Sequence, residues 1–407
     1  MPSNPPPPDS TTYFRKGFGL KAEVQEDLAA YEGALVDRMK ANDYTLVAGE
    51  VTIRLAREFG FCYGVERAVE YAYQTRRKFP SRRIVLVGEI IHNPYVNAQL
   101  QRLGIEILSR ADAPSFDFSS IAPEDVVILP AFGVTIEDFE QLRAKGCILV
   151  DTTCGSVLNV WKRVESYARD GFTALIHGKY YHEETRATAS QARKYGEGHY
   201  LVVRDIEDAR VVCDFIEGKV DASVVSSRFA PHAVSPGFDP ERDLQKIGVA
   251  NQTTMLARES LAIGEEVGAA IARARGVEAR AREFRTFDTI CSATQERQDA
   301  VLELLTEPLD AMIVIGGFNS SNTISLAALC AERVPTYHIE TSNAIDPEAK
   351  SVHFRRAEKV HRESDAVEWL PAGAVRVGVT AGASTPNNKS GDVVARILAT
   401  RGLTVPV

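Results

Sequence analysis

Residues 147–154 read CILVDTTC, residues 155–168 read GSVLNVWKRVESYA, and residues 173–187 read TALIHGKYYHEETRA. The apolar run Ile148–Val150 predicts a buried strand, and the polar residues that follow it are of the kind that cap a helix. Apolar side chains then recur at helical spacing, at Val157, Trp161, Val164 and Ala168. Cys154 is therefore expected where a strand ends and a helix begins. There the helix dipole lowers the pKa of a thiol and prepares it to bind metal or to attack.

The next apolar run, Ala174–Ile176, predicts a strand that leads into a loop with His177, His182, Glu183 and Glu184. A cysteine and a His-x-Glu group at the ends of neighbouring strands predict a reaction centre. Glu184 suits a general acid, a role that needs a raised pKa in a site poor in water. The alternative for Glu183 or Glu184 is a solvated helix start that the dipole favours.

Cys62 and Cys291 share the sequence context of Cys154, because each stands before a helical pattern and each falls in a different domain-sized segment. Three thiolates at one point suit an iron–sulfur cluster that leaves one iron without a protein ligand. Three unrelated helix starts are the alternative. Cys147, Cys213 and Cys330 lie within apolar patterns and are predicted to be buried apolar residues.

Strands and helices alternate along the chain, which predicts βαβ units and mainly parallel sheets. The 407 residues, 44% of them hydrophobic, are enough for several packed domains. We expect an α/β fold of three small α/β domains in a pseudo-threefold arrangement around a central iron–sulfur cluster. The predicted divisions are an N-terminal extension at 1–45 and domains at 46–153, 154–288 and 289–407. Further strands are predicted at 84–87, 126–129, 200–203, 247–250, 312–315 and 375–379, helices at 22–39 and 260–282, and a surface excursion at 220–243.

Composition excludes several classes of function. The formal charge of −8 argues against nonspecific binding to nucleic acids. Runs of about 18 apolar residues do not occur, so a membrane span is not expected. The first residues lack the apolar core of a secretory signal, which predicts a cytoplasmic protein. Six cysteines without a C-x-x-C pair suggest reduced thiols and count against zinc ribbons.

Two polar stretches, Asn319–Asn322 and Ser384–Pro386, fall at predicted strand-to-helix junctions. Backbone N–H groups and hydroxyls at such junctions bind anions, phosphate above all, although N-capping is the alternative. His92, His177 and His182 are predicted at strand ends, where they suit phosphate binding or proton transfer. Direct nucleotide binding is not expected, because the sequence has neither a Walker motif nor G-x-G-x-x-G.

Eight motifs between Val51 and Leu398 together resemble the LytB family of 4-hydroxy-3-methylbut-2-enyl diphosphate reductases. They are GFCYGVERAV, EIIHNPYVN, DTTC, HGKYYHEETRATAS, ANQTTM, ICSATQERQDAV, GGFNSSNTISL and TAGASTPNN. The long N-terminal region with RKGFG, and PAFG in place of an A-H-G sequence, resemble the longer cyanobacterial and plant branch.

The resemblance implies an iron–sulfur oxidoreductase of the non-mevalonate isoprenoid pathway. It would reductively dehydroxylate (E)-4-hydroxy-3-methylbut-2-enyl diphosphate to isopentenyl and dimethylallyl diphosphate. The implied cofactor is one oxygen-sensitive [4Fe–4S] cluster per chain, which can appear as [3Fe–4S] after oxidation. Its ligands would be Cys62, Cys154 and Cys291, and the substrate hydroxyl would bind the fourth iron. Ferredoxin or flavodoxin would deliver two electrons singly.

Carried over by motif, the diphosphate would be held by His92, His182, Ser320, Ser321, Asn322 and Ser384. Glu184 would deliver protons, Thr253 would position the hydroxyl, and both are expected to act with His182 in catalysis. Many members have a histidine where this chain has Phe132, and His177 is a candidate to compensate. Many also have a proline near Gly155-Ser156.

Other functions stay open at this point. Another enzyme with three cysteines in three domains, such as a quinolinate-synthase-like dehydratase, would bind a dicarboxylate in place of a diphosphate. A non-catalytic iron–sulfur sensor would use a fourth cysteine, for example Cys147, and structural zinc is disfavoured by the wide cysteine spacing. One hypothesis for the N-terminal extension is a docking surface for the electron donor.

Overall fold

The computed structural model describes residues 12–110, 115–196, 198–229, 231–357 and 362–406. The chain forms two compact units, which are described in turn. The first unit contains Met1–Gly17, Ser81–Ile90 and Ile105–Cys291. The second contains Phe18–Pro80, Ile91–Gly104 and Ser292–Val407.

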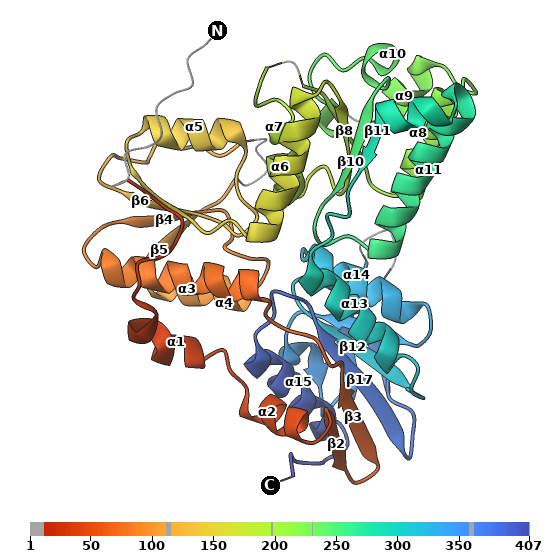
Figure 1. The fold of residues 1–407 in the computed structure, drawn as a ribbon. Coiled ribbons are helices and arrows are strands. Elements are labelled where there is room, and N and C mark those ends of the chain that lie inside the picture. The colour runs from red at the N-terminus through yellow and green to blue at the C-terminus, as the bar shows by residue number, and fades with distance from the viewer. Residues whose placement is uncertain (1–11, 111–114, 197, 230, 358–361, 407) are drawn as a thin grey trace. The chain divides into compact units, whose positions relative to one another are not determined.

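The first unit contains two parallel sheets (Figure 1). One has the order β1-β7-β6-β4-β5. Its strands are Tyr13–Phe14, Ile148–Asp151, Val126–Leu129, Ile84–Val87 and Ile105–Leu108 in that order. Every residue of β4 and β6 is buried, as expected for unbroken Val, Ile and Leu runs in the middle of a parallel sheet. Helix α5 (Ile136–Ala144) follows β6.

The second sheet of this unit has the order β11-β10-β8-β9. Its strands are Phe284–Thr286, Ile247–Asn251, Thr173–His177 and Tyr200–Val203. Helix α6 (Gly155–Arg169) buries Val160, Val164 and Tyr167 in the core of this sheet. The other helices are α7 (Glu183–Gln191), α8 (Ile206–Ile216), α9 (Ala222–Arg228), η2 (Pro231–Ala233), α10 (Pro240–Asp243), α11 (Ala257–Arg275) and α12 (Val277–Glu283).

The second unit is built on one mixed sheet of the order β14-β15-β13-β12-β17-β3-β2, and β16 pairs with β15 (Figure 1). Strands β3 (Val51–Leu55), β17 (Val375–Ala381), β12 (Ala311–Ile315) and β13 (Thr336–Ile339) run parallel. The antiparallel additions are β2 (Thr45–Ala48), β14 (Ile345–Asp346), β15 (Ser351–Arg355) and β16 (Glu363–Val367).

Helices of several lengths complete the second unit. They are η1 (Lys21–Val24), α1 (Gln25–Ala29), α2 (Ala34–Ala41), α3 (Tyr63–Lys78), α4 (Pro94–Arg102), α13 (Ser292–Leu304), α14 (Ser321–Ala331), η3 (Ser342–Ala344) and α15 (Asn387–Ala399).

Each of the three sheets contains the same run of four parallel strands: β7-β6-β4-β5, β11-β10-β8-β9 and β3-β17-β12-β13. The first strand of each run, namely β7, β11 or β3, is the one that leads to Cys154, Cys291 or Cys62. The predicted α/β class with mainly parallel sheets is confirmed, and three repeated sheets are consistent with three α/β domains. The predicted domain boundaries stay a prediction.

Three stretches differ from the sequence prediction. The predicted helix 260–282 is two helices, because Gly276 has a φ of 91° and ends α11. The predicted excursion 220–243 contains α9, η2 and α10 and buries Val225 and Phe229. The predicted helix 22–39 is divided into η1, α1 and α2. The break before α2 falls at Gly33, whose extended backbone makes it the N-cap residue of that helix.

Candidate active site

Three cysteines lie at the N-terminal ends of helices. Cys62 and Cys154 are the N-cap residues of α3 and α6, and Cys291 directly precedes α13. All three are partly exposed. The shared junction of strand, cysteine and helix is therefore confirmed, whereas metal binding by these thiols stays a prediction.

The other three cysteines are buried, as predicted. Burial raises the pKa of the Cys147 thiol to about 11 and that of Cys213 to about 12, and it also raises the pKa of Cys330. A thiol must lose its proton to bind a metal. Burial therefore disfavours Cys147, Cys213 and Cys330 as ligands.

The backbone holds each of the three partly exposed cysteines in the same way. The N–H of Cys62 donates to the carbonyl of Ala383 (3.2 Å), that of Cys154 to Ala131 (3.0 Å) and that of Cys291 to Thr253 (3.2 Å). Each acceptor lies two residues beyond the end of the neighbouring strand of the same sheet, namely β17, β6 and β10. The same kind of backbone hydrogen bond therefore positions all three cysteines.

In the first unit, Glu184 and Thr253 form a buried pair. The backbone N–H of Thr253 donates to one carboxylate oxygen of Glu184 (2.6 Å), and its hydroxyl donates to the other (3.1 Å). Glu184 is 2% exposed, so water has little access to this carboxylate. The carbonyl of Thr253 accepts the Cys291 N–H, so this threonine connects the candidate acid to a candidate ligand.

His182 caps the helix that carries Glu184. Its Nδ1 accepts the backbone N–H of Glu184 (3.2 Å), and α7 starts at the next residue. The ring of Phe132 packs edge-on against that of His182, with centroids 5.6 Å apart. The residue that replaces the family's histidine therefore orients a predicted substrate ligand by packing.

His177 lies in a different environment from the one proposed for it. The side chain is fully buried, and its Nδ1 lies 2.8 Å from the hydroxyl of Ser260. Burial lowers the pKa of His177 to about 4. A neutral ring enclosed in this way is a structural histidine, so the geometry gives no support to compensation for Phe132.

In the second unit, a polar cluster gathers four of the predicted diphosphate ligands. The hydroxyl of Ser384 lies 3.2 Å from the carbonyl of His92 and 3.5 Å from the hydroxyl of Ser320. The side-chain nitrogen of Asn319 lies 3.1 Å from Nδ1 of His92. Asn322 accepts the N–H of Ala383 (2.9 Å) through its amide oxygen.

The start of α14 combines both roles that the sequence left open there. Ser320 caps the helix, because its hydroxyl oxygen accepts the N–H and the hydroxyl of Thr323. Ser321 is buried in the first turn of the helix. Gly317 allows the backbone to approach closely, since a Cβ there would lie 2.7 Å from the His92 carbonyl oxygen. The junction is therefore compact and polar, as anion binding requires.

Sequence reasoning did not single out Gln252. Its amide oxygen accepts the Lys179 N–H (3.1 Å) and the Thr185 hydroxyl (3.0 Å), and its amide nitrogen donates to Thr254 (3.0 Å). This fully buried side chain joins the loop after β8 to the loop after β10. The polar stretch NQTT at residues 251–254 was the one feature of the sequence that could have pointed to Gln252.

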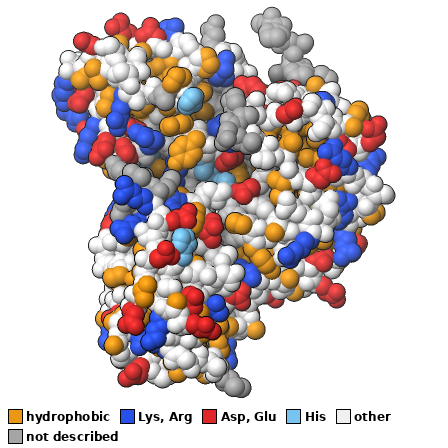
Figure 2. All heavy atoms as spheres, turned by 180° about the vertical axis from the view of Figure 1, so that it is seen from behind, with side chains coloured by type: hydrophobic (Ala, Val, Ile, Leu, Met, Phe, Trp, Pro, Cys, Tyr) orange, Lys and Arg blue, Asp and Glu red, His pale blue; other side chains and the backbone are white. Residues whose placement is uncertain are grey.

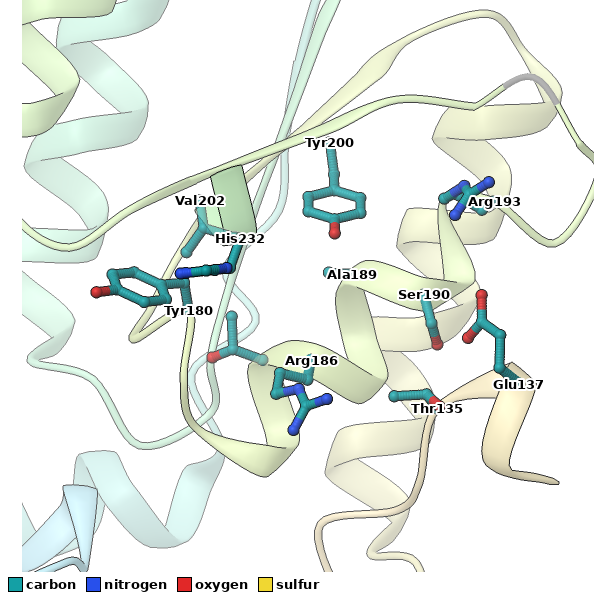
Figure 3. A pocket seen from close by; sticks show the side chains of 11 residues that line it. Thr135, Glu137, Tyr180, Arg186, Ala189, Ser190, Arg193, Tyr200, Val202 and His232 are labelled. Carbon is teal, nitrogen blue, oxygen red and sulfur yellow. The ribbon is translucent and has the colours of Figure 1, made fainter. Parts of the chain in front are cut away.

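A pocket of about 220 Å³ lies beside α7 (Figure 3). Its wall includes Arg186, Ser190 and Arg193 from the region of α7 and Thr135 from the start of α5. The Ser190 hydroxyl accepts the N–H of Ile136 (3.1 Å) and joins the two helices. None of the predicted site residues lines this pocket, so it is separate from the Glu184–Thr253 pair.

The surface shows charges of both signs. On the face drawn in Figure 2, Lys and Arg side chains are interspersed with Asp and Glu side chains. Among the described residues, none of the helices has the length and apolar character that crossing a membrane requires.

A family model described as LytB protein matches residues 53–398. The chain belongs to the LytB protein family. A 4-hydroxy-3-methylbut-2-enyl diphosphate reductase of Gloeobacter violaceus is 48% identical over 402 residues, 97% of this chain and 94% of the relative. One of Thermosynechococcus vestitus is 46% identical, over 97% of this chain and 96% of the relative. These nearly full-length LytB relatives are cyanobacterial, which confirms the predicted branch.

Solved structures of the LytB family have the same fold. A structure of (E)-4-hydroxy-3-methyl-but-2-enyl diphosphate reductase, the terminal enzyme of the non-mevalonate pathway, is 30% identical with a TM-score of 0.51. The match spans 85% of this chain and 98% of the chain in that solved structure. A Plasmodium falciparum E-1-hydroxy-2-methyl-but-2-enyl-4-diphosphate reductase is 22% identical, with a TM-score of 0.59 and coverage of 85% and 87%.

Proposed function

We propose that this LytB-family chain reduces (E)-4-hydroxy-3-methylbut-2-enyl diphosphate to isopentenyl and dimethylallyl diphosphate. The observation that carries the proposal is the cysteine junction that occurs three times with one backbone geometry. Relatives that cover nearly the whole chain bear the name of this reductase, which supports the same function.

The proposed cofactor is one [4Fe–4S] cluster held by Cys62, Cys154 and Cys291. The donor set fits, because these thiols are partly exposed at helix N-termini while the other three cysteines are buried. When bound, such a cluster supplies single electrons and one iron without a protein ligand. Ferredoxin or flavodoxin is the proposed donor. The cytoplasm is the proposed location, because its reducing conditions keep thiols free.

Burial and hydrogen bonding support the proposed roles of the remaining residues. Glu184 would hold a proton for the reacting carbon in a site with little water, and Thr253 would position the substrate hydroxyl. His92, His182, Ser320, Ser321, Asn322 and Ser384 would hold the diphosphate. His182 would also position Glu184 for catalysis, because it caps the helix that carries Glu184.

The test is anaerobic purification, followed by iron and sulfide analysis, EPR spectroscopy and product analysis. We expect four irons per chain, an EPR spectrum that the allylic diphosphate alters, and formation of both five-carbon diphosphates. The Cys154→Ser variant should lose the cluster and turnover, whereas Cys147→Ser serves as the matched buried control. A spectrum altered only by a dicarboxylate would favour a dehydratase, and bound zinc alone would contradict the proposal.

A further inference from the structure

A buried arginine holds the loop that precedes Cys62. The Nε and one terminal nitrogen of Arg297 donate to the carbonyl of Gly60, at 3.2 Å and 2.7 Å. The same terminal nitrogen also donates to the carbonyl of Phe61 (3.1 Å). Arg297 is 3% exposed and lies on α13, the helix that begins directly after Cys291. One side chain therefore joins the backbone of the Cys62 loop to the helix of the Cys291 junction.

The other two cysteine loops are braced differently. Three residues before Cys154, the carboxylate of Asp151 accepts the N–H of Thr153 (2.9 Å). Three residues before Cys291, the carboxylate of Asp288 accepts the N–H of Ile290 (3.1 Å). Phe59 occupies the corresponding position before Cys62 and has no side-chain acceptor. The loops before Cys154 and Cys291 are each held by an aspartate of their own. The loop before Cys62 is held by Arg297, which lies on a different element, α13.

A second connection runs in parallel with the first. The Asn322 amide nitrogen lies 3.4 Å from the hydroxyl of Thr294, in the first turn of α13. Its amide oxygen accepts the N–H of Ala383, whose carbonyl accepts the N–H of Cys62. Helix α13 is thus tied to the Cys62 loop through two separate sets of hydrogen bonds.

Arg297 donates to backbone oxygens at each of its printed contacts. Its remaining terminal nitrogen donates to the carbonyl of Ala293 (2.8 Å), so all of its acceptors are backbone oxygens. Among the described residues, no carboxylate forms an ion pair with it. A buried cation costs free energy unless an anion compensates it. A cluster held by thiolates is such an anion.

We propose that Arg297 is a positioning residue for the Cys62 loop, which it ties to the helix that follows Cys291, and that its charge raises the reduction potential of the cluster. The inference rests on the cluster in the proposed function. A positive charge stabilises the reduced, more negative cluster more than the oxidised one, and local charge is among the factors that set iron–sulfur potentials. The guanidinium group also holds two consecutive carbonyls through several N–H donors in a fixed plane, whereas the ammonium group of a lysine is a single point of charge and would hold them less well.

The test compares Arg297→Gln and Arg297→Lys with Arg396→Gln and Arg396→Lys, which are controls at an exposed arginine, in the anaerobically purified protein. Arg396 also donates to a backbone carbonyl, that of Ile345, from helix α15. Redox titration followed by EPR gives the potential, and iron release to a chelator gives the rate of cluster loss. Neither measurement needs the diphosphate. If the wild-type cluster titrates normally but reduces no diphosphate, the proposed function fails and the inference about Arg297 is still decided.

We expect Arg297→Gln to lower the one-electron reduction equilibrium constant about tenfold, which corresponds to about 59 mV. Arg297→Lys should keep the potential within about twofold in that constant but lose iron several-fold faster than Arg396→Lys, because the fork is lost. A wild-type potential in Arg297→Gln, or equal shifts in the Gln and Lys variants, would overturn the electrostatic role. If Arg297→Gln does not fold, the Lys variant decides the bracing role, and iron release at the Arg396→Lys rate would overturn it.

Discussion

Glu184 and its neighbours show how single side chains prepare the proposed reaction. Its carboxylate accepts two hydrogen bonds from Thr253, while the adjacent Glu183 pairs with Arg110 (3.0 Å). The same helix N-terminus thus carries one enclosed acid and one that forms a partly exposed ion pair. The sequence left both candidates open, and burial distinguishes them.

Replacing Glu184 by Gln should lower turnover by about 10²-fold or more, because a positioned general acid is lost. The cluster should be retained, as shown by iron content and EPR. Glu183→Gln is the matched control and should keep turnover within about twofold. Full activity of the Glu184→Gln variant would show that this carboxylate has another role.

We expect His177 to make the stability of the fold depend on pH. Burial lowers its pKa from 6.5 to about 4, so the ring stays neutral in the folded chain while the unfolded chain binds a proton below pH 6.5. Stability from this group is therefore complete above pH 6.5 and is lost as pH falls toward 4. At pH 5 the loss amounts to about 2 kcal/mol.

Thermal unfolding of wild type and His177→Gln at pH 7.5 and pH 5.0 measures this effect. The wild type should lose more stability on acidification than the variant does. His353→Gln is the comparison, because its exposed ring pairs with Glu363 and Asp365, which raise its pKa. Equal acid sensitivity of the wild type and His177→Gln would remove His177 from the explanation.

At the scale of elements, α6 begins directly after Cys154 and links the two sheets of the first unit. The cysteine follows β7, and α6 then packs on the sheet that contains β10. The fully buried Tyr167 fills the contact and donates its hydroxyl to the carbonyl of Val249 (2.9 Å). Gly248 makes room for the ring, since a Cβ there would lie 2.5 Å from Tyr167 Cγ.

The Gly248→Ala variant should lose about 1–3 kcal/mol of stability, because the added methyl forces Tyr167 and α6 to shift. Differential scanning calorimetry of the anaerobic protein measures the change. Gly155→Ala, in the first turn of the same helix with open space around it, should cause no loss. If the Gly248→Ala variant melts at the wild-type temperature, α6 and Tyr167 can shift to accommodate the added methyl group without loss of stability.

At the scale of the whole molecule, residues 13–15 connect the start of the described chain to the Cys154 junction. Residues Tyr13–Phe14 form β1 and pair with β7, the strand that leads to Cys154. The hydroxyl of Tyr13 donates to Asp151 (2.6 Å), and Arg15 forms an ion pair with the same carboxylate (3.2 Å). The segment thereby holds the aspartate that braces the Cys154 loop.

Deleting residues 1–17 should lower the melting temperature and accelerate iron loss, because β7 loses the pairing with β1 and Asp151 loses two partners, at a cost of about 1–3 kcal/mol. Activity should fall equally with ferredoxin and with a small chemical reductant. The Tyr13→Phe, Arg15→Gln double variant keeps the chain length and should show part of the loss. A deletion that raised only the KM for ferredoxin would support a donor-docking role instead.

The sequence by itself determined the class of fold, most central strands, the strand–cysteine–helix junctions and the family. These features are local, because apolar periodicity and capping residues act within about ten positions of the chain. Strands β4, β6 and β9 have the predicted bounds because their apolar runs are bordered by turn residues. Strand β1 was missed, because its two residues pair with β7 more than a hundred positions away.

Only the tertiary structure decided which polar side chains act together. Glu184 and Thr253, Ser384 and His92, and Arg297 and Gly60 are far apart in sequence. Their hydrogen bonds depend on the packing of loops and helices that are remote from one another in the sequence. That placement also separates the structural His177 from the other histidines, since burial of a side chain results from packing by remote elements and leaves no signature in the neighbouring residues.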